Sequence, residues 1–193
     1  RYRSMVADAL NGKGEIGMTL LKPGWESDYQ GTPEIMTIGC LGKIKHHSEL
    51  PEGKYNILLS GLYRFRILNE IKGKVYRQAQ VEFLKEINDK DLTSEPSPTK
   101  EKLTRVMRLY LKNLPDRTKI EQALDMENCC KLAEFVDKLT HHFDLPVNKM
   151  QEFLEQQDVQ KRADSLHSLI EFKNQLIQIS KNMKDKEIDF SMN

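Results

Sequence analysis

Three pairs of adjacent residues have the side chains that bind zinc: His46 with His47, Cys129 with Cys130, and His141 with His142. A structural zinc site brings four thiolate or imidazole ligands into a tetrahedron. Neighbouring residues on a helix point about 100 degrees apart, so Cys129 and Cys130 do not readily serve one such ion, and no CxxC pair supports them. The sequence therefore predicts no metal site, with one cysteine in a helical core and the histidines on the surface.

Nucleotide binding and nucleophilic catalysis also lack their motifs. A phosphate-binding loop needs GxxxxGK followed by Ser or Thr, and the short turn Gly12-Lys13-Gly14 does not have that spacing. The pair Ser60-Gly61 falls in a predicted strand, unlike the strand-to-helix turn that presents a catalytic serine. We expect no catalytic residue and no cofactor.

Composition indicates a folded chain with no strong electrostatic preference. Of 193 residues, 38% are hydrophobic and 31% charged, and 30 basic residues nearly cancel 29 acidic ones. No global field therefore favours nucleic acid or an anionic membrane, and no run approaches the roughly 18 apolar residues that span a bilayer. Three cysteines without framework spacing suit a reducing cytoplasm. We expect a cytoplasmic protein with no membrane partner.

The first half of the chain has the period-two pattern of β-strands. After a short helical pattern over residues 1–11, apolar and polar residues alternate in several runs, with Pro51 and Gly53 placed for a tight turn and Gly61 for a bend or bulge. We expect strands in these runs: 15–21, 35–45, 55–59, 63–67 and 75–83. Short strands joined by short turns favour a small antiparallel barrel or twisted sheet over residues 1–87.

The second half has a helical period. Residues 88–99 have the polar, proline-containing composition of a linker, and residues 100–184 predict four helices, with Thr99 as the N-cap of the first. Residues 185–193 form a polar tail. The fold class is therefore α+β, an antiparallel β domain followed by an all-helical bundle with a long C-terminal helix.

The last predicted helix, about 158–184, carries two apolar stripes. One runs Val159, Ala163, Leu166, Ile170 and Ile177, and the other runs Leu169, Phe172, Leu176, Ile179 and Met183. Their spacing of three and four is the seam pattern of paired helices, so the second stripe is a candidate for helix pairing. The simpler interpretation, which we favour, is that both stripes form one broad core face.

Several motifs, in order along the chain, resemble the N-terminal domain of Lon proteases. These are Arg1-Tyr2-Arg3, a TxG strand at Thr37–Gly39, the turn Leu50-Pro51-Glu52-Gly53, the strand Leu58–Ile67, and Leu154-Glu155 with Asp158-Val159 and Arg162. The resemblance implies a PUA-like β domain followed by a helical bundle. Because family members have an apolar strand before the first motif, it also implies that the first strand is missing and that the sheet exposes an edge.

The resemblance further implies a role in protein recognition. In the family this domain recognises unfolded or tagged proteins and helps the protease to assemble, whereas separate domains hydrolyse ATP and cleave peptides. No counterpart of those ATPase and Ser-Lys protease domains occurs here, so we expect a stand-alone member or an excised domain that is not an enzyme. Its expected partners are unfolded or tagged clients, an ATP-dependent protease, or a second copy of itself.

The binding residues follow from exposure arguments alone. We expect a client's apolar segment or degron in a groove between the β domain and the bundle, contacted by Trp25, Tyr29, Met36 and Met150. One alternative is RNA binding, because Arg64, Arg66, Lys72, Lys74 and Arg77 are interleaved with aromatic residues. The aromatic residues Tyr63 and Phe65 alternate with Arg64 and Arg66, as the core face and the solvated face of a strand do. This pattern argues against nucleic acid as the partner. The other alternative is a self-associating adaptor or scaffold.

Overall fold

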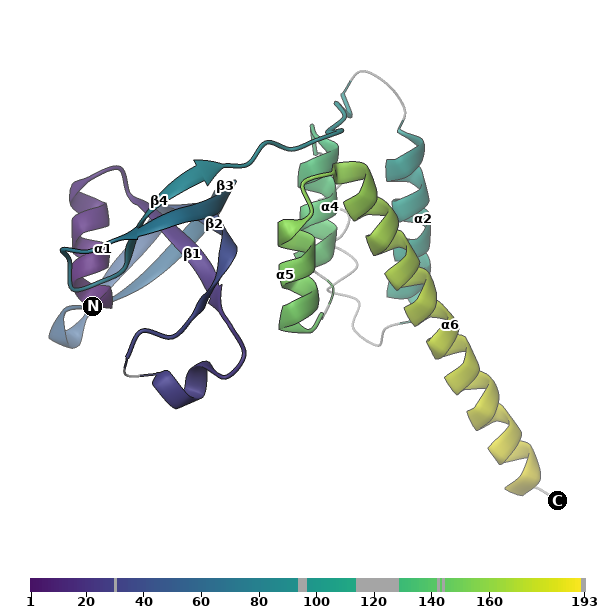
Figure 1. Cartoon of the computed structure of the whole chain (residues 1–193). Helices are drawn as coiled ribbons and strands as arrows, with labels where there is room; N and C mark the ends of the chain where they lie inside the picture. Colours follow the sequence, from purple (N-terminus) through teal and green to yellow (C-terminus); the bar gives the residue numbers. More distant parts are fainter. Residues whose placement is uncertain (30, 94–96, 114–128, 142, 144, 192–193) are drawn as a thin grey trace. The chain divides into compact units, whose positions relative to one another are not determined.

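The computed structural model describes the chain except for residues 30, 94–96, 114–128, 142, 144 and 192–193, with the backbone alone described over 184–191. The chain divides into two compact units. Residues 1–85 and 151–155 form the sheet unit, and residues 86–150 and 156–193 form the helical unit. Figure 1 shows the strands and the first helix of the sheet unit and the helices of the helical unit.

The sheet unit is a curled antiparallel sheet with one helix. The helix α1 comes first, and the strands follow in the spatial order β1-β2-β3-β4. The elements are α1 (Tyr2–Asn11), β1 (Glu15–Leu21), β2 (Ile35–Leu50), β3 (Lys54–Ile71) and β4 (Gln78–Phe83). Within the described residues, β1 pairs only with β2 and β4 only with β3. Both outer strands therefore keep a free edge.

The hairpin of β2 and β3 is longer than the sequence pattern predicts. A short turn at Pro51–Gly53 joins the strands, with Glu52 and Gly53 both at a φ of 66°. The runs expected at 55–59 and 63–67 form one strand, because a register shift lets Gly42 pair with Gly61 while Leu41 pairs with Tyr63. Leu62 is left as the extra residue of this strand, next to Gly61, where the sequence predicted a bend or bulge. Such a bulge bends a strand without ending it.

The last strand begins later than expected. The alternating pattern starts at Val75, but β4 begins at Gln78, and the Val75 side chain is exposed. The preceding turn is tied to α1, since Lys74 and Tyr76 both donate hydrogen bonds to the Asp8 carboxylate. These long-range contacts override the local alternation.

The helices that follow the sheet are α2 (Pro98–Lys112), α4 (Leu132–His141), α5 (Val147–Glu155) and α6 (Val159–Ser191), and all but the second half of α5 belong to the helical unit. The N-cap of α2 is Ser97 and not Thr99, because the Ser97 hydroxyl accepts from the Lys100 amide at 3.3 Å and Pro98 occupies the first turn. The second half of α5 belongs to the sheet unit: Gln151 donates to the Ile38 carbonyl at 3.1 Å and Arg64 to that of Leu154 at 3.0 Å.

Asp89 and Lys90, which lie between the sheet and α2, form hydrogen bonds with the start of α4. The Leu132 amide donates to the Lys90 carbonyl at 2.9 Å, and the Ala133 amide donates to the Asp89 carboxylate at 2.9 Å. Asp89 thus supplies an acceptor for a free amide of the first turn of α4. The expected closing residue of the first helix, Pro115, lies outside the described residues.

The two stripes of α6 have different environments, so the interpretation of one broad core face is wrong. Val159, Leu166 and Ile170 have no exposed surface, and they pack in the core of the unit. The second stripe is half-buried at Leu169 and then open, with exposed fractions of 57% at Phe172, 48% at Leu176, 55% at Ile179 and 62% at Met183. Nothing in the described part of the chain covers these four residues.

We predict that truncating the two stripes has very different effects on stability. Leu166→Ala removes a fully buried side chain and should lower the free energy of unfolding by about 2–5 kcal/mol, measured by urea denaturation. The matched variant Phe172→Ala should change it by less than about 0.5 kcal/mol, because that ring is already in solvent. Equal losses in a monomeric sample would contradict the assignment of the stripes.

Candidate functional site

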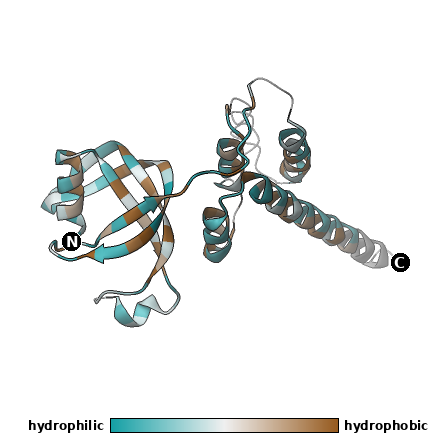
Figure 2. Cartoon of the chain, turned by 45° about the horizontal axis from the view of Figure 1, so that its top comes forward, coloured by the Kyte–Doolittle hydropathy of each residue, from teal (hydrophilic) through white to brown (hydrophobic). Residues whose placement is uncertain are grey.

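The concave face of the sheet and α1 enclose a cavity of about 490 Å³. Met5, Asp8 and Ala9 line it from α1, where their spacing of three and four places them on one side of the helix. The apolar residues that line it from the strands are Ile16, Ile35, Leu41, Phe65, Ile67, Ala79 and Val81. Figure 2 shows the alternation of brown apolar and teal polar residues along these strands. The volume is within the range of small-ligand sites, about 300–1,000 Å³.

Two glycines set the depth of the cavity. The ring of Phe65 is buried, and it lies where side chains on Gly17 and Gly39 would otherwise be. A Cβ added at these positions would approach its Cζ to 3.2 Å and 2.7 Å. A side chain at either position would therefore collide with the ring, so both glycines are needed for Phe65 to lie beside the cavity.

The rim of the cavity is charged, and most of its charges are paired. The Asp8 carboxylate accepts hydrogen bonds from Tyr76 at 2.7 Å and from Lys74 at 2.9 Å. Both lower the pKa of the Asp8 carboxyl, and the hydrogen bond from Tyr76 has the larger effect. Each of these two donors has its own pKa raised by its hydrogen bond to Asp8. Arg77 pairs with Glu70. These contacts hold α1 and a turn in place, and a phenol with a raised pKa is a poor base or nucleophile at neutral pH.

Glu15 differs from the other rim carboxylates. Its side chain is half-buried at the start of β1, lines the cavity, and has no hydrogen bond or ion pair within the described residues. It is therefore available to a cationic group in the cavity mouth.

The predicted binding residues lie in both units. Trp25 and Tyr29 meet at the short helical turn Trp25–Asp28, with ring centroids 5.6 Å apart. Trp25 is half-buried and Tyr29 is 56% exposed. Met36 is half-buried in β2, and Met150 is half-buried in the part of α5 that belongs to the helical unit. The structure brings the two aromatic rings together, and a binding role for all four stays a prediction.

The sequence interpretation missed the cavity. Its signal was present in the alternation of Ile67, Ala79 and Val81 and in the helical spacing of Met5 and Ala9. Alternation identifies the inward face of a strand but does not show whether anything covers that face.

Within the described part of the chain, no group of three or more His, Cys, Asp or Glu side chains lies close enough together to bind a metal ion. Cys129 is buried, which raises the pKa of its thiol, and Cys130 is exposed. His46, His47 and His141 are exposed, and His142 is outside the described residues. Among the described helices, none is long and apolar enough to cross a membrane.

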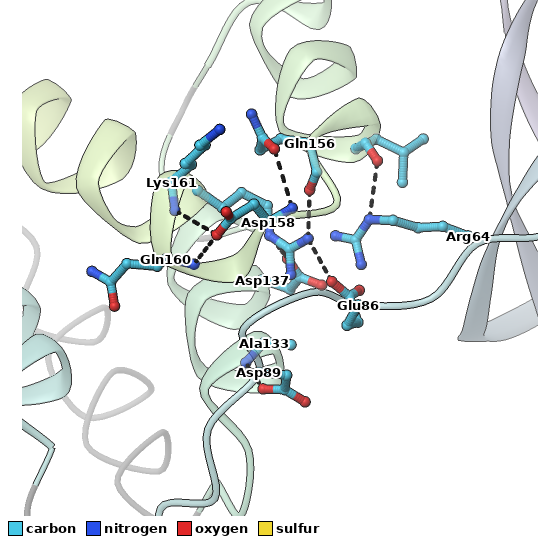
Figure 3. A network of polar contacts seen from close by, with 11 residues as sticks. Arg64, Glu86, Asp89, Ala133, Asp137, Gln156, Asp158, Gln160 and Lys161 are labelled. Atoms are coloured by element: carbon cyan, nitrogen blue, oxygen red, sulfur yellow. Dashed lines mark hydrogen bonds and ion pairs between the residues drawn. The ribbon is translucent and has the colours of Figure 1, made fainter.

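The buried guanidinium of Arg162 joins three segments of the helical unit, and Figure 3 labels its partners Glu86, Asp137 and Gln156. The Arg162 side chain has no exposed surface and donates to the Glu86 carboxylate at 2.9 Å and to the Gln156 carbonyl at 2.8 Å. Its Nε lies 3.3 Å from an Asp137 oxygen, an ion pair outside hydrogen-bond geometry. Two partly exposed acids thus compensate one buried cation, which is needed because an unpaired buried charge is very costly.

Asp158 precedes this arginine and begins α6. Its carboxylate accepts from the Gln160 amide at 3.0 Å and the Lys161 amide at 3.2 Å, and also from Asn88 at 3.0 Å. The backbone hydrogen bond from Lys161 is the main cause of its lowered pKa. The spacing of Asp158 and Arg162 therefore combines a helix cap with the buried cation of the next turn.

We predict that removing the two acids lowers the free energy of unfolding more than removing Arg162 does. The double variant Glu86→Gln with Asp137→Asn leaves the guanidinium buried without a counter-charge, and it should cost about 3–5 kcal/mol in urea denaturation. Arg162→Met replaces the cation with an apolar chain of similar length and should cost less. The opposite order would mean that the ion pairs do not stabilise this arginine.

Comparisons with known proteins agree with this architecture. Residues 1–171 match the family model described as the ATP-dependent protease La (LON) substrate-binding domain. Lon protease 1 of Bacillus subtilis (strain 168) is 25% identical over 160 residues, which are 80% of this chain and 20% of that protein. The Lon protease of Dictyoglomus thermophilum is 26% identical over 184 residues, which are 94% of this chain and 22% of that protein. The chain therefore spans about a fifth of the length of these relatives.

A solved structure shows the same fold. The N-terminal domain of the Mycobacterium avium complex Lon protease has a TM-score of 0.53 and 15% identity, covering 81% of this chain and 89% of that one. The expected fold class, an antiparallel sheet followed by helices, is confirmed.

Proposed function

The chain belongs to the LON substrate-binding domain family, and from this premise we propose that it binds unfolded or degron-bearing protein segments rather than catalysing a reaction. One observation carries the proposal: apolar side chains of the sheet unit line an open cavity that α1 covers only in part. Such a surface suits an apolar segment of another chain. The charged groups on its rim are mostly bonded to one another and do not form a nucleophile with its base.

The cellular setting follows from the same proposal. The clients would be delivered to an ATP-dependent protease, on another chain or on a further part of this one. None of the three cysteines forms a disulfide, which suits the reducing cytoplasm.

RNA binding has less support. Of the basic residues that suggested it, Arg66 pairs with Glu82, Lys74 with Asp8, and Arg77 with Glu70. Paired cations attract phosphate less strongly than free ones, because the neighbouring carboxylates repel it.

We predict that the chain binds a reduced, carboxymethylated protein and not its native form, measured by fluorescence anisotropy of the labelled client. Binding through apolar contacts should change little between low and moderate salt. Trp25→Ala and Tyr29→Ala should each weaken it by about three- to tenfold, because aromatic residues dominate such contacts. Tyr2→Ala, at another exposed aromatic side chain, is the control.

Single-stranded RNA is the comparison ligand in the same titration. RNA binding that falls steeply with salt, together with no preference for the unfolded client, would reverse the order of the two hypotheses.

A second candidate function, self-association as an adaptor or scaffold, is favoured by the open stripe of α6. Phe172, Leu176, Ile179 and Met183 repeat at intervals of four, three and four and point away from the buried stripe of the same helix. This is the spacing of the seam in a two-helix coiled coil, and a second copy of α6 would bury such a stripe.

For this candidate we predict a dimer by sedimentation velocity that dissociates on Leu176→Lys with Ile179→Lys. Two lysines in the seam would place unpaired charges in an apolar interface. The control pair, Gln175→Lys with Gln178→Lys, adds the same charges at exposed neighbouring positions and should leave the dimer intact. A monomeric parent chain would exclude this function.

A further inference from the structure

The helical unit has an open groove of its own between α2 and α6, which pack side by side (Figure 1). Its volume is about 1180 Å³, and the described residues that line it all lie in 101–112 of α2 or 167–175 of α6. Both helices belong to the helical unit, so the geometry of this groove is set within one compact unit.

Basic side chains dominate the α2 wall of the groove. The cations that line it are Lys102, Arg105, Arg108 and Lys112, and the carboxylates are Glu101 and Glu171. Lys102, Arg105 and Lys112 are exposed and form no ion pair with any described residue. The chain as a whole is almost neutral, so the groove is a local positive patch that attracts carboxylates.

Asn174 adds an unsatisfied acceptor to the floor of the groove. Its side chain is only 6% exposed, and its Nδ2 donates a hydrogen bond to the Val106 carbonyl at 3.1 Å. Its Oδ1 is buried and accepts no hydrogen bond from any described residue. A buried acceptor without a donor costs free energy, and an N–H group of a bound segment would supply the missing donor.

The other lining residues favour a polypeptide over a nucleic acid. None of the described residues in the lining is a Phe, Tyr or Trp on which a base could stack, and Glu101 and Glu171 would repel a row of phosphates. Val106 and the half-exposed Leu109 offer apolar contact. Two apolar side chains are too few to pack against the stripe of a third helix, which favours a thinner, extended segment.

The spacing of the cations indicates the spacing of the carboxylates. Lys102, Arg105, Leu109 and Lys112 follow one another at intervals of three, four and three, which places them on one side of α2. Lys102 and Lys112 are about 15 Å apart along the helix axis at 1.5 Å per residue. In an extended chain, side chains four residues apart share a face and are about 13 Å apart.

We infer that this groove binds an extended acidic segment of another protein chain, with two carboxylates on either side of an aliphatic residue. The carboxylates pair with Lys102 and Lys112, the aliphatic side chain contacts Leu109, and an N–H group of the segment donates to Asn174. This second site does not rest on the proposed function, because the cavity described above lies in the sheet unit.

The test titrates the whole chain into a fluorescein-labelled nine-residue peptide of serine and threonine, with leucine at its centre and a glutamate two residues to each side. Fluorescence anisotropy should show binding that weakens about three- to tenfold between low and moderate salt, because salt screens exposed charges. The same peptide with glutamine in place of both glutamates should not bind.

Charge reversal tests the position of the site. Lys102→Glu with Lys112→Glu should weaken the glutamate peptide at least about tenfold, because repulsion replaces two ion pairs. Lys90→Glu with Lys161→Glu changes the net charge equally at exposed positions outside the groove and should change the affinity less than about twofold. Thermal unfolding shows whether both double variants remain folded, and equal losses of affinity would overturn the groove.

Asn174→Leu separates a binding role from a structural one. Leucine is similar in size and removes the unsatisfied acceptor, so the unfolding temperature should stay the same or rise. The affinity for the glutamate peptide should fall about three- to tenfold, because the segment loses an acceptor. A lower unfolding temperature with unchanged affinity would mean that Asn174 only positions α2 against α6.

Two outcomes separate this inference from its alternatives. If the parent chain binds the carboxymethylated client but not the glutamate peptide, the groove is wrong and client recognition stands. If single-stranded RNA displaces the glutamate peptide and binds more tightly, the occupant is a nucleic acid, and the assignment to an acidic protein segment is overturned.

Discussion

A curled sheet that does not close has to leave main-chain groups unpaired at two edges and apolar side chains uncovered between them. In this chain β1 and β4 are those edges, and α1 covers only part of the concave face. The position of α1 depends on a few polar contacts, chiefly those of Asp8 with Lys74 and Tyr76. The open depth depends on Gly17 and Gly39, which let the Phe65 ring lie against the strands.

The helical unit solves a different problem, that of joining helices through a buried charge. Arg162 replaces apolar packing with contacts to Glu86, Asp137 and the Gln156 carbonyl, so that three segments distant in sequence share one cation. The first stripe of α6 then supplies the apolar core, through residues such as Leu166 and Ile170. The second stripe contributes nothing to that core beyond Leu169, which leaves it open to a partner.

Local signals in the sequence predicted most of the elements. The period-two runs located β1 and β2, the Pro51–Gly53 turn located the hairpin, and Gly61 predicted the bulge. Errors arose where a distant contact decides the outcome. Val75 continues an alternating pattern, yet the contacts of its neighbours with Asp8 keep it out of β4.

The sites were harder to predict than the elements, for a related reason. Periodicity shows which side chains share a face, and burial depends on what packs against that face. The two stripes of α6 look alike in sequence, and only the fold shows that Leu166 is covered and Leu176 is not. The motif with Asp158 and Arg162 was recognised by resemblance, but its physical basis, a cap next to a buried ion pair, appears only in the structure.

The central claim is that the chain binds unfolded client segments at the apolar cavity of the sheet unit. Amide hydrogen exchange of the whole chain, with and without a carboxymethylated client, tests it most directly, because main-chain amides beside an occupied cavity exchange more slowly. The account predicts slower exchange in β1 (Glu15–Leu21) on binding, with little change in α4 (Leu132–His141). Protection confined to α6, with β1 unchanged, would contradict it.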